Sequence, residues 1–371
     1  MKKVLLLFIL TILSAVNLQA QVPPPPPLTE EVIKFETQLV EVPFVVTDKT
    51  GKPLLNLKRE NFIVYEDGVK QEVAEFAATN APFEVALLLD TSGSTSMNLR
   101  LIKRAAAYFI ESLRPGDKVA IIALDTIVED GRKRSDSRVI SYLTDDRIAL
   151  NEALEKVNTS NSTPYYDALL QITEKVFDKP PTEEFRGRRA LVALTDGVDS
   201  SSISDFTEAQ EEISAKNLVS FFIKVNTREF FEDNLLGDCV GAMRFSGAQI
   251  QRYYKTFYGG TKIEKISDFC KLGDFERLDI SRKLYGLADL EMNSLAKNSG
   301  GKVFPVADLS EARNAFRKVA DEIGTKYSLA YYPKNEKRDG TFRKIKVELK
   351  GVPAGVGVQA REGYTAPKNQ K

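Results

Sequence analysis

Residues 85–94 of the chain have the sequence VALLLDTSGS. Five apolar residues, Val85 to Leu89, are followed by a short run of oxygen-bearing side chains that one glycine interrupts. An unbroken apolar run of this length, ended by turn-forming residues, predicts a strand buried on both faces of a sheet. The polar residues then lie at the carboxyl end of that strand, where α/β sheets bind their ligands.

Downstream of this strand, apolar strands alternate with amphipathic helices. Further strands are expected at 118–124, 138–143, 190–194, 219–225 and 303–306, with 138–143 at an edge. Helices are expected near 102–113, 148–157, 164–177, 204–216, 287–297 and 310–323. This alternation predicts an α/β fold, a doubly wound and mainly parallel sheet covered by helices on both faces. We assign residues 82–325 to this domain.

The segments on either side of the α/β domain have β character. The run at 62–65 precedes Asp67-Gly68, a strong hairpin signal, and residues 345–349 alternate between apolar and charged side chains. Each segment alone has too few strands to bury an apolar face. We therefore predict that residues 33–81 and 326–366 are the two halves of one small β-sandwich, followed by a short tail at 367–371.

The N-terminus predicts export. Two lysines precede an apolar run from Val4 to Ala15, and Leu18-Gln19-Ala20 offers a cleavage site, so residues 1–20 are assigned as a signal peptide. A membrane anchor is the alternative, but the run is short for a span of about 20 residues, so no stable span is expected after cleavage. A proline-rich spacer follows at 21–32. The protein is expected in the periplasm, on the cell surface or outside the cell.

The alternation of strands and helices is interrupted at about 227–285, a segment referred to below as the insertion. It is charged, rich in aromatic residues, and contains both cysteines of the chain, Cys239 and Cys270. In an oxidising compartment an isolated pair favours one disulfide, with two buried free thiols as the alternative.

Composition narrows the chemistry. Lys+Arg and Asp+Glu both number 52, so there is no basic excess to favour nucleic acid or an anionic membrane as a partner. The sequence contains no His, which removes the commonest general base, the serine and cysteine triads, and His-ligated zinc.

Five side chains at the ends of predicted elements form a candidate metal site. They are two carboxylates and three hydroxyls: Asp90, Ser92, Ser94, Thr163 and Asp196. Asp196 follows the strand at 190–194 and reaches the same edge as Asp90 if the two strands are neighbours. Such hard oxygen ligands suit Mg²⁺, with Mn²⁺ or Ca²⁺ as substitutes. A coordination position left to water can accept a carboxylate from another molecule.

Asp90-x-Ser92-x-Ser94 resembles the metal-ion-dependent adhesion site (MIDAS) of von Willebrand factor type A (VWA) and integrin I domains. Thr163 and Thr195-Asp196-Gly197 resemble the second and third loops of that family. The chain departs from the pattern at Asn161-Ser162, where bacterial members commonly have two glycines.

Outside the α/β domain, residues 42–48, 61–68, 331–333 and 361–364 resemble the exported "VWFA-related" proteins typical of Acidobacteria. The resemblance covers the mature chain except for about 228–283. It implies binding outside the cytoplasm. Our interpretation of the site is a non-enzymatic adhesion or scaffold module whose metal ion coordinates an Asp or Glu side chain of a protein partner.

Other interpretations stay open at this point. The rival function is a metal-dependent hydrolase or phosphoryl chemistry at Asp90, and a third possibility is a scaffold with a vestigial metal site. An isolated Asp-x-Ser-x-Ser is also common as a turn or helix cap. Three further carboxylates near these loops, Asp125, Asp130 and Asp199, are expected to cap, turn or be solvated rather than bind metal.

Overall fold

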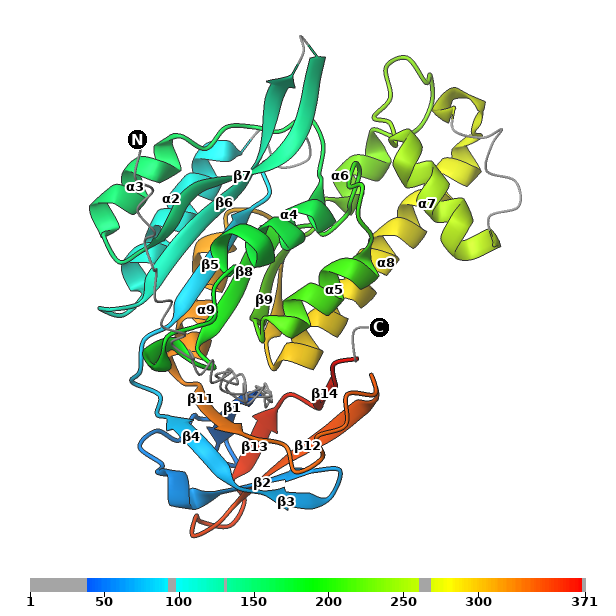
Figure 1. Ribbon diagram of the computed structural model, residues 1–371. Coiled ribbons are helices and arrows are strands. Elements are labelled where there is room, and N and C mark those ends of the chain that lie inside the picture. Colours follow the sequence, from blue (N-terminus) through cyan, green and yellow to red (C-terminus); the bar gives the residue numbers. More distant parts are fainter. Residues whose placement is uncertain (1–38, 93–97, 130–131, 260–267, 369–371) are drawn as a thin grey trace, which may run out of the picture. The chain divides into compact units, whose positions relative to one another are not determined.

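A six-stranded sheet lies at the centre of the α/β domain (Figure 1), in the order β10-β9-β8-β5-β6-β7. The computed structural model describes residues 39–368 except 93–97, 130–131 and 260–267. The strands are β5 (Glu84–Leu89), β6 (Lys118–Glu129), β7 (Arg132–Thr144), β8 (Arg189–Thr195), β9 (Val219–Val225) and β10 (Lys302–Val306). The edge pair β6–β7 is antiparallel and the other neighbouring pairs are parallel. The predicted sheet is confirmed.

Burial on both faces explains the continuous apolar run of β5. Val85, Leu87 and Leu89 pack into the hydrophobic core on one side of the sheet. Ala86 and Leu88, which point the other way, pack into the core on the opposite side. Because successive side chains of a strand alternate between faces, a central strand needs apolar residues at every position.

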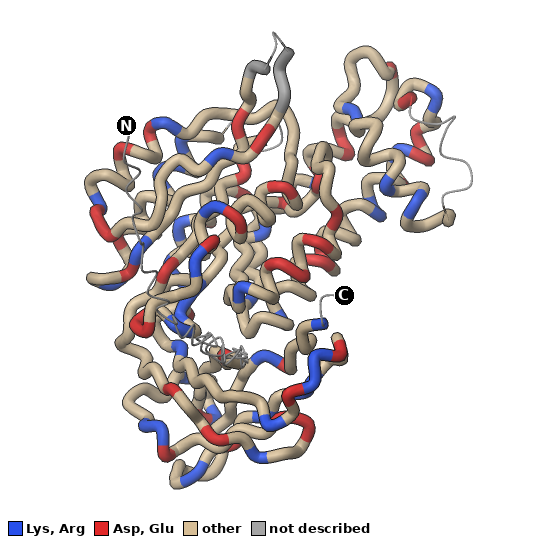
Figure 2. The backbone as a smooth tube through the Cα atoms, in the orientation of Figure 1, with Lys and Arg blue, Asp and Glu red and all other residues tan. Residues whose placement is uncertain are grey.

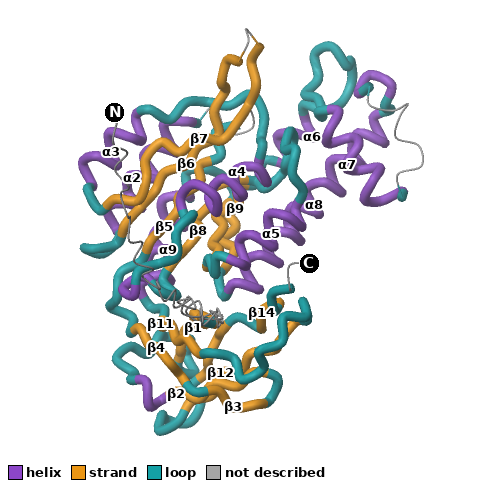
Figure 3. Tube along the Cα trace, in the orientation of Figure 1, coloured by secondary structure: helices purple, strands orange, loops and turns teal. Residues whose placement is uncertain are grey.

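Helices cover both faces of the sheet (Figure 3), as predicted for a doubly wound fold. One face is covered by α2 (Leu99–Ser112), α3 (Arg147–Glu155) and α9 (Ala312–Gly324). The other is covered by α4 (Tyr165–Gln171), with a π-helical turn at Ile172–Val176, by α5 (Phe206–Ala215) and by the second half of α8 (Asp274–Ser299).

The terminal β segments pair with each other in two four-stranded sheets, β13-β1-β11-β4 and β14-β12-β2-β3. From the N-terminal segment come β1 (Val40–Thr47), β2 (Phe62–Glu66), β3 (Val69–Gln71) and β4 (Val73–Ala77). From the C-terminal segment come β11 (Tyr327–Tyr331), β12 (Phe342–Leu349), β13 (Gly357–Ala360) and β14 (Gly363–Thr365). The β1–β11 and β2–β12 ladders join the two segments, which share one hydrophobic core. This is the pairing that the sequence predicts.

The Asp-Gly hairpin between β2 and β3 forms as predicted. Asp67 and Gly68 both have positive φ angles, 47° and 81°, and a tight two-residue turn of this hand requires them.

The insertion has a small hydrophobic core of its own. It contains α6 (Arg228–Asp233), α7 (Gly247–Tyr258), a 3₁₀ turn at Phe269–Lys271 and the first half of α8. The predicted disulfide joins Cys239 and Cys270, whose Cα atoms are 5.3 Å apart. It links the loop before α7 to the turn before α8.

One predicted boundary is wrong: α8 begins at Asp274, not near residue 287. Its first half buries polar residues, Arg277 and Ser281, among apolar ones, which weakens the apolar periodicity there. The helix therefore runs without a break from the core of the insertion to the core under the sheet. Even so, no helix in the described residues is long and apolar enough to cross a membrane.

Candidate metal-binding site

Strands β5 and β8 are neighbours, so the residues that follow them reach one edge of the sheet. Leu89 pairs with Leu194 in the parallel register, and the backbone N–H of Asp90 donates to the carbonyl of Leu194 at 3.0 Å. Asp90 and Asp196 thus follow the carboxyl ends of two adjacent strands. This confirms the adjacency on which the predicted site depends.

Asp90 is held by groups from its own loop and from the end of β8. Its side chain is 1% exposed. One carboxylate oxygen accepts the backbone N–H of Ser92 at 3.0 Å, and the other accepts the Thr195 hydroxyl at 2.7 Å. Burial raises the pKa of Asp90, while hydrogen bonds from Ser92 and Thr195 oppose the rise. A nearby cation would offset the cost of burying this charge.

Asp196 is held by its own loop and by the insertion. Its side chain is 4% exposed, and Oδ1 accepts the backbone N–H of Val198 at 3.0 Å. Its Oδ2 accepts the hydroxyl of Thr227 at 2.5 Å, and Thr227 Oγ1 lies 2.9 Å from the Tyr285 hydroxyl. Since the Thr227 proton is donated to Asp196, Tyr285 donates to Thr227. Neither Thr227 nor Tyr285 was identified from the sequence, because no local motif links them to Asp196.

Gly197, next to Asp196, adopts a φ of 75°, and a Cβ there would lie 2.8 Å from the terminal carbon of Met292 in α8. Only glycine meets both demands without strain.

The loop that contains Thr163 is bonded to both other loops. The Thr163 N–H donates to Ser200 Oγ at 2.7 Å, and its carbonyl accepts the Ser200 N–H at 2.9 Å. The Ser160 N–H donates to the carbonyl of Thr91 at 2.9 Å. Thr163 is 7% exposed.

Asn161 and Ser162 stand where bacterial members of the family commonly have two glycines. Hydroxyl groups of the β6–β7 hairpin bind the backbone of both residues. The Asn161 N–H donates to Thr126 Oγ1 at 3.1 Å, and the Ser162 N–H donates to Ser135 Oγ at 3.0 Å. The loop therefore keeps its backbone hydrogen-bonded without the flexibility of glycine.

Four of the five predicted ligands lie in loops at this edge and are buried: Asp90, Ser92, Thr163 and Asp196. Ser94 lies outside the described residues. The charges of Asp90 and Asp196 both act on the Tyr165 and Tyr285 hydroxyls, whose pKa values are raised mainly by burial and further by these carboxylates. The two carboxylates therefore share one region.

Of the neighbouring carboxylates, Asp199 has the capping role predicted for it, whereas Asp125 is buried and ion-paired rather than solvated. Asp199 accepts the backbone N–H of Tyr165 at 2.9 Å, at the start of α4, and the Ser202 hydroxyl at 2.5 Å. Burial raises the pKa of Asp199 to about 6. Asp125 forms an ion pair with Arg138 at 2.7 Å. Asp130 lies outside the described residues.

Tyr165 adds a polar group that sequence reasoning missed. Its hydroxyl is buried and has no hydrogen-bond partner among the described residues. A buried hydroxyl without a partner costs free energy, and such groups in native structures often mark the place of a water or an ion.

The donor chemistry fits a divalent cation held partly by hydroxyls. Within the described residues, no three acidic or cysteine side chains gather as a conventional metal cluster. The set instead combines two buried carboxylates, whose charges balance a divalent ion, with hydroxyl oxygens at the same edge. Hard oxygen donors of this kind suit Mg²⁺ or Ca²⁺.

Residues 85–199 match the family model described as the von Willebrand factor type A domain. No curated protein matches the chain in sequence. Among solved structures, a von Willebrand factor type A protein from Catenulispora acidiphila is 14% identical with a TM-score of 0.42, covering 90% of this chain and 64% of that one.

Proximal thread matrix protein 1 from the mussel byssus is 12% identical, with a TM-score of 0.42 and coverage of 73% of this chain and 50% of that one. Another structure of that protein, with a zinc-occupied MIDAS motif, is 14% identical with a TM-score of 0.41, covering 73% of this chain and 49% of that one. The chain thus spans less than two thirds of the length of these solved chains. The α/β region is thus similar to von Willebrand factor type A domains over residues 85–199.

Proposed function

We propose that this chain is an exported binding protein whose VWA domain holds a divalent cation at a MIDAS. Mg²⁺ is the proposed ion, with Mn²⁺ or Ca²⁺ as substitutes, and the ligands are Asp90, Ser92, Ser94, Thr163 and Asp196. The observation that carries the proposal is the position of Asp90 and Asp196, two buried carboxylates at the ends of neighbouring strands.

The proposed partner is a protein that presents an Asp or Glu side chain to the metal ion. Two carboxylates balance the charge of a divalent cation, and neutral hydroxyls donate weakly, so the ion retains affinity for a further anionic oxygen. A carboxylate from another molecule supplies that oxygen. The relationship to exported "VWFA-related" proteins is part of the same proposal.

The proposed role is binding rather than catalysis. The sequence has no His, so no imidazole can act as general base beside a metal-bound water. Turnover of activated esters or phosphate monoesters, lost in Asp90→Ala, would instead support the hydrolase alternative.

Export is supported by the N-terminal sequence and by the cysteines. Residues 1–20 have the composition of a signal peptide, and they lie outside the described residues. The Cys239–Cys270 disulfide suits an oxidising compartment such as the bacterial periplasm.

Calorimetric titration of the mature chain with Mg²⁺ and Mn²⁺ tests the proposal. We expect dissociation constants on the order of micromolar to millimolar, because neutral hydroxyls supply most of the ligands. Asp90→Ala abolishes binding, whereas Asp125→Asn, which alters a nearby carboxylate paired with Arg138, leaves it unchanged. Equal binding by wild type and Asp90→Ala contradicts the proposed site, and no binding by wild type supports a vestigial site.

A further inference from the structure

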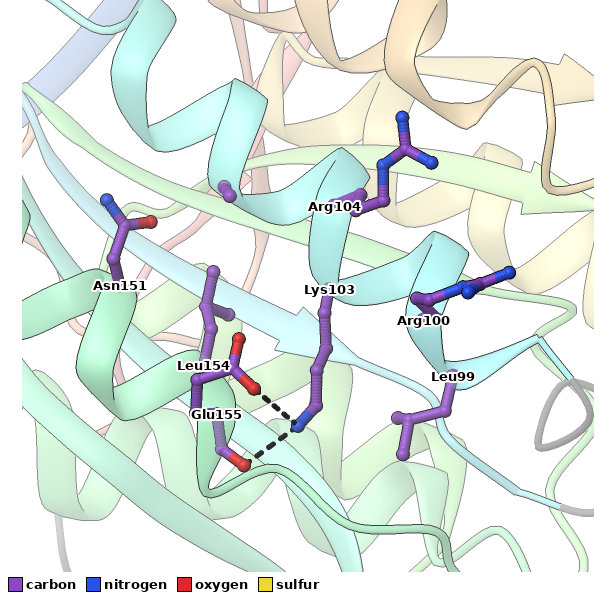
Figure 4. A pocket seen from close by; sticks show the side chains of 8 residues that line it. Leu99, Arg100, Lys103, Arg104, Asn151, Leu154 and Glu155 are labelled. Carbon is purple, nitrogen blue, oxygen red and sulfur yellow. Dashed lines mark hydrogen bonds and ion pairs between the residues drawn. The ribbon is translucent and has the colours of Figure 1, made fainter.

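An open groove of about 630 Å³ lies between α2 and α3 (Figure 4). Arg100, Lys103 and Arg104 of α2 line it, together with Asn151 and Glu155 of α3. Its size is within the range of ligand-binding clefts. Three cations and one carboxylate give its lining a positive charge, and Figure 2 shows the basic residues of this helix.

The three cations differ in their partners. Lys103 Nζ donates to the carbonyl of Glu155 at 2.8 Å and lies 3.6 Å from its carboxylate, so it joins α2 to α3. Arg100 and Arg104 are exposed, and neither forms a hydrogen bond or ion pair in the described part of the chain. Two guanidinium groups are therefore available to an anion from outside.

The positions of these arginines are unfavourable for the helix itself. Arg100 lies in the first turn of α2, where the helix dipole favours negative charge, and that turn contains no acidic residue. Arg100 and Arg104 are also four residues apart, so like charges face each other on one side of the helix. Local choices that work against stability are typical of functional sites.

The groove is close to the proposed metal site along the chain. Arg100 follows Ser92 by eight residues, so the two lie at most about 29 Å apart. Arg104 lies about 6 Å further along the helix. An extended partner segment of about nine residues is long enough to reach from the proposed metal site to Arg100.

We propose that the groove binds an acidic protein segment of the partner, one that also contains apolar residues. This rests on the proposed function, since the same segment supplies the carboxylate for the metal ion. Arg side chains bind carboxylates in a two-pronged geometry, which matches the free guanidinium groups. Leu99, Ala107 and Leu154 form the apolar part of the lining, and this favours a peptide over an anionic polysaccharide.

The test measures binding of a fluorescent peptide that alternates Glu and Leu, by anisotropy, to the mature chain in Mg²⁺. The variant is Arg100→Gln/Arg104→Gln, since Gln has nearly the helix propensity of Arg and the fold is kept. We expect affinity to fall about tenfold, because each exposed charge pair contributes modestly. The control, Lys344→Gln/Lys350→Gln, removes the same charge from exposed positions at β12 and is expected to bind like wild type.

Three results would overturn the inference: equal affinity of both variants, equal binding of a Gln/Leu peptide, or a sulfated polysaccharide that binds more tightly than the peptide and depends on the same arginines. Repeating the peptide titration with Asp90→Ala, beside the calorimetric titration with Mg²⁺, separates the proposed metal site from the proposed groove. If metal binding fails but peptide affinity still depends on Arg100 and Arg104, the proposed function alone is wrong. If metal binding holds and the arginines have no effect on peptide affinity, this inference alone is wrong.

Discussion

Asp90 and Asp196 follow neighbouring strands, yet different regions of the molecule hold them. Asp90 accepts hydrogen bonds from Ser92 in its own loop and from Thr195 at the end of β8. Asp196 accepts from Thr227 at the start of the insertion, and Tyr285 near its end is bonded to Thr227. Besides the backbone N–H that each accepts from its own loop, Asp90 therefore depends on the sheet and Asp196 on the insertion.

This difference makes the insertion a structural part of the site. Val198, two residues after Asp196, packs in the core of the insertion with Tyr285. Glu291 of α8 forms a second link between the insertion and the helices on the sheet. Its carboxylate accepts hydrogen bonds from the guanidinium of Arg252 in α7 and from the hydroxyl of Tyr166 in α4, both at 2.7 Å. We therefore expect changes in the insertion to act on Asp196 more than on Asp90.

The largest expected effect follows from removing the disulfide. Cys239→Ser/Cys270→Ser opens a loop with a sequence separation of 31 residues, which corresponds to about 3 to 4 kcal/mol of chain entropy. We expect faster hydrogen exchange for the amides of α7, while those of β5 and β8 exchange at the wild-type rate. Reduced wild-type protein is the control and is expected to match the variant. Equal acceleration in β5 and β8 would show that the insertion and the sheet unfold as one unit.

A smaller effect concerns pH and the carboxyl group of Asp199. Its pKa in the folded protein is raised from 3.8 to about 6 by burial, so the folded state holds the proton more tightly than the unfolded chain. The resulting stabilisation is complete below about pH 4 and is lost as the pH rises through 6, about 3 kcal/mol in total.

Urea unfolding of metal-free protein between pH 4 and 7 measures this contribution, and Asp199→Asn is expected to remove it. The Asn side chain can still accept the Tyr165 N–H, so the start of α4 keeps its cap. An unchanged pH slope in the variant would assign the dependence to other groups, of which Glu41, with its pKa raised to about 7 by burial, is one.

The sheet side of the site could be predicted from the sequence because its determinants are local. The apolar run of β5 specifies a buried central strand, and the polar residues after it must lie at the carboxyl edge. The parallel register then brings Thr195 to Asp90. The hairpin at Asp67-Gly68 was predictable for the same reason, since two adjacent residues specify the turn.

The insertion side could not be predicted in the same way. Thr227 and Tyr285 are 58 residues apart, and their contact depends on how α8 packs against the loop after β9. The buried polar residues of α8 hid the first half of that helix, and with it the position of Tyr285. Long-range contacts between polar side chains leave no periodic pattern in the sequence.

A still smaller effect isolates the hydrogen bond between Thr227 and Asp196. Thr227→Val keeps the shape of the side chain but removes the donor to Oδ2 of Asp196. Groups that orient metal ligands typically contribute about tenfold or more to affinity, so we expect Mg²⁺ binding to weaken about tenfold in calorimetry. Thr195→Val removes the corresponding hydroxyl from Asp90, together with the acceptor of the Gly197 N–H, and is the comparison variant on the sheet side.

Combining each valine variant with Cys239→Ser/Cys270→Ser shows whether the two halves of the site are separate. If the insertion positions Asp196 through Thr227, loss of the disulfide and loss of that hydroxyl act on one carboxylate, and their effects on Mg²⁺ affinity do not add. The Thr195→Val effect, by contrast, adds to that of the cysteine variant, because Thr195 belongs to the sheet. Additivity in both combinations would mean that the contacts of Thr227 do not transmit the state of the insertion to Asp196. Tyr285→Phe, which retains the ring in the core but not the donor to Thr227, is expected to give a smaller loss than Thr227→Val along the same chain of hydrogen bonds.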